Sequence, residues 1–105
     1  MTFQEIFKKV KEYFINTDVS RVKGHMAFQF NIIGEGSGIF YAEIKDGRLY
    51  IEPYDYNDRD VTFTATADTY FKIASRQLNP RIAYADRKLK IDGDLGKAME
   101  LLLLL

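Results

Sequence analysis

Only a few side chains in this sequence are of the types that carry out acid–base, nucleophilic or metal chemistry. The chain has one histidine, His25, and no cysteine, which excludes disulfides, thiolate zinc sites and cysteine nucleophiles. His25 lies on the polar alternation at the start of a predicted strand, and the sequence places no serine, acid or second histidine to orient it. We therefore expect a surface histidine and not a catalytic base.

An acidic segment is the second candidate for chemistry. Its members have the spacing of the first ligands of a calcium loop: Asp55, Asn57, Asp58 and Asp60. However, the sixth position of such a loop is Asp60 where glycine is needed, and the twelfth is Thr66 where glutamate supplies two oxygens. A solvated turn fits the segment better, so we predict no metal site.

A glycine-rich segment, residues 34–38, invites comparison with a phosphate-binding loop or, through Ser37, with a nucleophile elbow. Both need a helix directly after the loop, whereas residues 39–44 continue as an alternating strand. The position of the elbow's first glycine is also occupied by Glu35. The segment therefore predicts a flexible hairpin, and the sequence as a whole predicts no enzyme and no cofactor.

The overall composition limits the classes of partner. Fifteen Lys and Arg balance fifteen Asp and Glu, which leaves no net field to attract a nucleic-acid backbone. A hydrophobic fraction of 47% in 105 residues suits one folded domain over residues 1–105. The segment Met1–Val10 lacks the basic-then-apolar order of a signal peptide, so we expect a cytoplasmic location.

Apolar side chains are in excess for a domain of this size. Eight Phe, seven Tyr and three Met are present, and the last five residues are all leucine. These leucines make the end of the last predicted helix apolar on every side. They are too few to span a bilayer, which takes about 20 residues. A cavity, a second protomer or a membrane is expected to cover them. Nearby basic residues either dock anionic lipid head groups or, more simply, form a solvated rim: Arg76, Arg81, Arg87 and Lys88.

Periodicity and capping signals predict four helices and five strands. Helices are expected over about residues 2–15, 66–78, 80–84 and 94–103, where apolar residues recur at helical spacing. Thr2, Thr66 and Asp94 are expected to cap three of them, and Pro80 opens the other. Strands with a period of two are expected over residues 26–32, 39–44, 49–51, 61–65 and 88–92, with a tight turn at residues 46–47.

These elements predict an α+β fold with a single five-stranded, mostly antiparallel sheet. Each predicted strand has one apolar and one polar face, so helices should cover one face and water the other. The helical link between the fourth and fifth strands is expected to provide a crossover.

The second half of the chain resembles the sterol carrier protein type 2 family. The resemblance rests on a threonine-alternating strand over residues 60–66, Tyr70-Phe71, the turn Leu78-Asn79-Pro80, Ala83-Tyr84, and the run from Lys88 to Met99. Residues 24–53 are similar to the family in their strand, hairpin and aspartate–glycine turn. The resemblance implies a five-stranded sheet with helices on one face around an apolar tunnel.

In that fold the tunnel takes fatty acids, acyl-coenzyme A, sterols or other lipids. Carried over by position, its wall would draw on apolar residues of two strands and three helices: Phe28, Phe30, Ile32, Phe63, Phe71, Leu78, Ile82, Met99, Leu102 and Leu103. The resemblance therefore implies a non-enzymatic carrier of fatty-acyl or other elongated apolar ligands. Transient contact with a membrane is a separate expectation for a partner of such a carrier.

Two departures from the family qualify this implication. The chain stops at Leu105, earlier than many members, and it lacks the serine-lysine-leucine address of peroxisomal ones. Both favour a small free-standing prokaryotic member and an acyl chain over a sterol. The alternative function is a protein-interaction module whose leucine-rich terminal helix forms a homodimer or docks on an enzyme.

Overall fold

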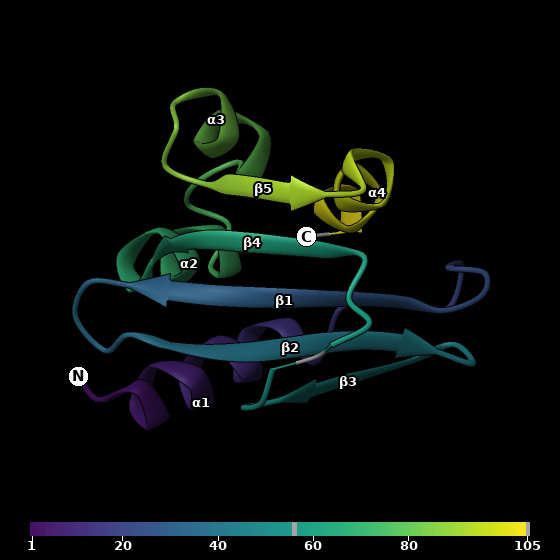
Figure 1. The fold of residues 1–105 in the computed structure, drawn as a ribbon, viewed down its shortest axis with the longest axis horizontal. Coiled ribbons are helices and arrows are strands. Elements are labelled where there is room, and N and C mark those ends of the chain that lie inside the picture. Colours follow the sequence, from purple (N-terminus) through teal and green to yellow (C-terminus); the bar gives the residue numbers. More distant parts are fainter. Residues whose placement is uncertain (56, 105) are drawn as a thin grey trace.

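The computed structural model describes residues 1–55 and 57–104. Its elements are α1 (Phe3–Phe14), β1 (Met26–Ile33), β2 (Gly38–Lys45), β3 (Arg48–Glu52), β4 (Val61–Thr66), α2 (Ala67–Ala74), α3 (Pro80–Ala85), β5 (Lys90–Gly93) and α4 (Leu95–Leu104). The strands form one five-stranded sheet in the order β3-β2-β1-β4-β5 (Figure 1). The predicted α+β fold and element order are confirmed.

The connectivity of the sheet places the crossover elsewhere than expected. β1 pairs antiparallel with β2 and parallel with β4, so the chain crosses over between β3 and β4 (Figure 1). The helical link between β4 and β5 instead joins two neighbouring antiparallel strands. A meander of three strands leaves one edge of β1 free, and β4 pairs there before the helices begin.

One face of the sheet carries the hydrophobic core. The side chains of Phe28, Phe30 and Phe63 alternate toward the helices and are at most 4% exposed. The Phe30 ring stacks on Phe40 at a centroid distance of 4.8 Å and on Phe63 at 5.1 Å. Helices α1 and α2 lie behind this face in Figure 1. Burial of these large aromatic rings stabilises the fold through the hydrophobic effect.

The strand alternation predicted that water would cover the opposite face of the sheet. The structure differs, because part of this face is buried. Ala27 and Gln29 on the central strand are 0% and 5% exposed. The connection from β3 to β4 returns in front of β2 and β1 (Figure 1), and the Asp60 N–H at its end donates to the Ala27 carbonyl at 2.8 Å. Gln29 Nε2 in turn donates to Asn31 Oδ1 at 3.0 Å, which satisfies a buried amide.

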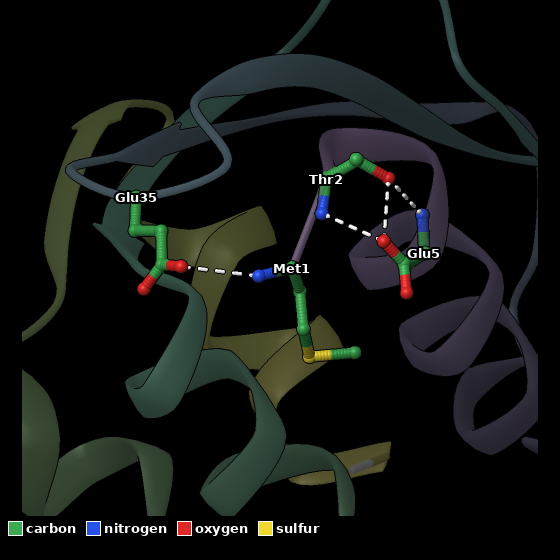
Figure 2. Close-up of polar contacts among 4 residues, drawn as sticks. All are labelled: Met1, Thr2, Glu5 and Glu35. Carbon is green, nitrogen blue, oxygen red and sulfur yellow. Dashed lines mark hydrogen bonds and ion pairs between the residues drawn. The ribbon is translucent and has the colours of Figure 1, made fainter.

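The N-terminus of α1 is capped as its sequence predicts. Figure 2 shows the Thr2 hydroxyl accepting the Glu5 N–H at 3.2 Å while the Glu5 carboxylate accepts the Thr2 N–H at 3.0 Å. The hydrogen bond from the Thr2 backbone is the main cause that lowers the pKa of Glu5. The Met1 ammonium also pairs with Glu35 at 3.0 Å, so the glycine-rich turn between β1 and β2 lies against the start of α1 (Figure 2).

The glycine-rich segment serves packing. A Cβ atom at Gly38 would overlap the Phe3 ring, so only glycine lets the start of α1 approach β2 this closely. The segment leads into a strand and not into a helix, as expected from the sequence.

Candidate functional site

A groove of about 360 Å³ opens between the end of α2, the start of α3 and the end of α4. This volume is at the lower end of the range for small-molecule sites. Its apolar lining consists of Ile73, Leu78, Pro80, Leu102 and Leu103, and its polar lining of Arg76, Asn79 and Arg81.

The turn between α2 and α3 forms one wall of the groove. The expected helix over residues 66–78 ends at Ala74, because Arg76 adopts a left-handed backbone with a φ of 63°. The side chain of Asn79 then caps α3 by accepting the Arg81 N–H at 2.8 Å, and Pro80 occupies the first helical position. Leu78 belongs to this short turn and is therefore free to line the groove.

Helix α4 forms the other wall and is held at its start by Asp60. The Asp60 carbonyl accepts the Asp94 N–H at 2.9 Å, and its carboxylate pairs with Lys97 Nζ at 2.9 Å. Asp94 caps the helix by accepting the Lys97 N–H at 3.1 Å, as predicted. The beginning of α4 is thus fixed to the sheet, and its far end borders the groove.

The environment of Asp60 has two opposing effects on its acidity. Burial raises the pKa of the Asp60 carboxyl, but the hydrogen bond from Lys97, the Ala27 N–H and the positive charge of Lys97 together outweigh burial and hold this pKa below its usual value. The same hydrogen bond is the main cause that raises the pKa of Lys97. Asp60, proposed and discounted as a calcium ligand, therefore serves as a structural carboxylate.

Four of the predicted ligand-binding residues lie in the core. Phe28, Phe30, Ile32 and Phe63 are at most 4% exposed and fill the space between the sheet and the helices. A small apolar void of about 20 Å³ lies beside Phe30, and Phe14 and Leu101 also line it.

The other predicted residues lie at four different places. Leu78, Leu102 and Leu103 meet in the groove, where Leu103 remains 68% exposed. Phe71 lines a second hollow of about 270 Å³ at the start of α2. Met99 is half-buried on α4, and Ile82 is 54% exposed on α3, outside the groove. The tunnel wall assigned through the family resemblance stays a prediction.

Sequence reasoning missed Ile73, Asn79 and Pro80 as groove residues and named Arg76 and Arg81 only as a basic rim. Ile73 was detectable, because it is buried at helical spacing from Tyr70 on the apolar stripe of α2. No local signal reveals that Arg76 faces the same space as Leu103, since that depends on the docking of α4.

No His, Asp or Glu among the described residues lines the groove. No cluster of three or more His, Cys, Asp or Glu suited to a metal ion occurs among them. His25 Nε2 lies 2.6 Å from Glu43 Oε2, and neither residue lines the groove. Within the same part of the chain, no helix has the length and apolar character needed to cross a membrane.

Comparison with known proteins assigns the family. Hydroxysteroid dehydrogenase-like protein 2 of Homo sapiens is 34% identical over 102 residues, which are 93% of this chain and 23% of that protein. This chain thus spans less than a quarter of the curated relatives it matches. Among solved structures, palmitated SCP2L2 of Aedes aegypti superposes with a TM-score of 0.72 at 21% identity, covering 99% of this chain and 94% of that one.

The sterol carrier protein 2 of Aedes aegypti in complex with palmitate superposes with a TM-score of 0.61 at 20% identity, covering 97% and 92% of the two chains. These two likenesses show the shared fold. Residues 3–105 match the family model described as the SCP-2 sterol transfer family. The chain therefore belongs to the SCP-2 sterol transfer family.

Proposed function

We propose that this chain binds a single-chain lipid, such as a fatty acid, in the groove between α2, α3 and α4, without catalysing a reaction on it. The observation that carries the proposal is the apolar lining of this groove by Leu78, Leu102 and Leu103. Two Aedes aegypti proteins of the same fold are described with palmitate bound. The family to which the chain belongs is one of sterol transfer, which supports a lipid cargo.

The size of the groove sets the expected affinity. Burial of roughly ten methylenes at about 0.8 kcal/mol each contributes about 8 kcal/mol before entropy losses, so the dissociation constant is expected to be micromolar at best. Binding of this strength still permits release, as transfer requires.

Titration of purified protein with palmitate, followed by native mass spectrometry and calorimetry, tests this proposal. Leu78→Glu places a charge in the lining and should weaken palmitate binding at least tenfold. The matched control is Ile82→Glu, since Ile82 is 54% exposed on the neighbouring helix and lies outside the groove. Absence of binding by the native protein, or equal losses in both variants, would contradict the proposal. Circular dichroism verifies that each variant is folded.

A second candidate function is homodimerisation through α4. Leu95, Met99 and Leu103 lie four residues apart on one face of this helix, and Leu95 and Leu103 are 48% and 68% exposed. If this stripe is an interface, light scattering of the native protein should give twice the monomer mass. Leu103→Glu should then restore the monomer mass, whereas a monomer in the native protein at all concentrations argues against a dimer.

The cytoplasmic location and the transient membrane contact predicted from the sequence belong to the same proposal. A carrier of this kind must meet a membrane to load or release lipid. Sedimentation with vesicles of neutral and anionic lipid tests the contact, and cell fractionation tests the location.

A further inference from the structure

The charged side chains around the groove all have the same sign. Arg76 lies before the turn that carries Leu78, and Arg81 lies after it. Neither guanidinium has an ion pair or hydrogen bond with another described residue, and no Asp or Glu lines the groove. The remaining polar side chain, Asn79, already accepts the Arg81 N–H at 2.8 Å. The rim therefore presents two free cations beside an apolar lining.

The arrangement matches the two ends of an ionised fatty acid. A guanidinium is planar, stays charged and presents parallel N–H donors that fit the two oxygens of a carboxylate. The leucine side chains of the turn and of α4 supply an apolar surface next to these donors. A neutral lipid would gain the apolar contact alone, so the arginines would discriminate by charge.

We propose that Arg76 and Arg81 form an anion clamp at the rim of the groove, which binds the carboxylate of a fatty acid while its acyl chain lies against Leu78, Leu102 and Leu103. This inference rests on the lipid binding proposed above and adds the class of head group and the orientation of the ligand.

The backbone at Arg76 provides a sharp test. Its φ of 63° lies in the left-handed region, which favours glycine. Arg76→Gly should therefore raise the thermal midpoint and yet weaken fatty-acid binding, two effects that a merely structural role would not separate. Arg87 has the same conformation after α3, with a φ of 62°, and does not line the groove. Arg87→Gly is thus the matched control.

The experiment compares laurate with dodecan-1-ol, which has the same chain and no charge, by calorimetry at a pH where laurate is ionised. Arg76→Gly and Arg81→Gln should each weaken laurate binding about tenfold. This is the effect expected from the loss of one hydrogen bond to a charged group. Their affinity for dodecan-1-ol should change less than about twofold, and Arg87→Gly should bind both ligands like the native protein. Inorganic phosphate alone should not compete with laurate, because it lacks the chain.

Every other outcome contradicts either the anion clamp alone or the clamp together with lipid binding. If both ligands bind the native protein and the arginine variants weaken them equally or not at all, the clamp is wrong and lipid binding stands. Losses in Arg87→Gly as large as in Arg76→Gly overturn the clamp as well. Competition by phosphate indicates a site for free anions instead. If neither ligand binds the native protein, the proposed function fails together with the clamp.

Discussion

Replacement of Asp60 by alanine should destabilise the fold by about 2 to 3 kcal/mol. The Asp60 carboxylate accepts the Ala27 N–H at 2.9 Å and pairs with Lys97 Nζ at 2.9 Å. A hydrogen bond to a charged group contributes about 1.5 to 3 kcal/mol. The ion pair adds only about 0.2 to 1 kcal/mol, because the Lys97 side chain is 37% exposed. Asp60→Asn retains an acceptor for the Ala27 N–H and should lose about 1 kcal/mol.

The pH dependence of this effect follows from the acidity of Asp60. Its pKa in the folded protein is held below the unfolded value by Lys97 and the Ala27 N–H, which outweigh the effect of burial. A carboxylate of this kind contributes its full stability above the unfolded pKa of about 3.9 and loses it as the pH falls through the folded pKa. The stability gap between the native protein and Asp60→Asn should therefore be constant above about pH 5 and shrink below about pH 4.

Urea unfolding followed by circular dichroism measures this gap at neutral pH and at several acidic values. The difference between the two proteins isolates Asp60 from Glu5 and Asp18, whose pKa values are also lowered. Lys97→Gln serves as the partner variant, and its effect should vanish in the Asp60→Ala background. A gap that stays constant into acid, or that widens there, would refute the assigned role of Asp60.

Two further predictions concern glycines with a positive φ and one buried hydroxyl group. Gly93→Ala should destabilise by more than about 2 kcal/mol, because Gly93 has a φ of 118° and an added Cβ would overlap the Asp60 carbonyl. Gly34→Ala, with a φ of 81° and open space around it, should cost about 1 kcal/mol, and thermal unfolding of both variants checks the order. Tyr70→Phe removes a buried hydroxyl that donates to the Asn31 carbonyl at 2.9 Å and should cost about 1 kcal/mol in urea unfolding. An unchanged midpoint in that variant would show that the hydroxyl gains nothing over water.

Much of the fold could be predicted from the sequence because the relevant signals are local. The reciprocal cap of Thr2 and Glu5, the tight turn at Asp46 and Gly47, and the start of α3 at Pro80 each depend on residues a few positions apart. Alternation likewise predicted which side chains of β1 face the core, including Phe28 and Phe30. These features need no knowledge of how distant segments dock.

Packing between distant segments limited the prediction of the candidate site. Phe28 and Phe63 pack in the aromatic core. Residue type alone does not separate a core side chain from a cavity wall, so their assignment to a tunnel stays a prediction. Ile82 was expected beside them and lies 54% exposed, because α3 has only Ala83 buried. Residue type alone indicates apolar character, whereas the location of a side chain depends on how the elements pack.

The sequence by itself determined the helices, the strands and the family resemblance, because hydrogen-bonded caps, turns and hydrophobic periods act within a few residues. Only the tertiary structure decided that β4 pairs parallel with β1 and that Leu78 meets Leu103 across a groove. That meeting depends on the left-handed residue that ends α2 and on the ion pair of Asp60 and Lys97 that holds the start of α4. Contacts between residues so far apart in the chain follow from the docking of whole elements, which no local pattern encodes.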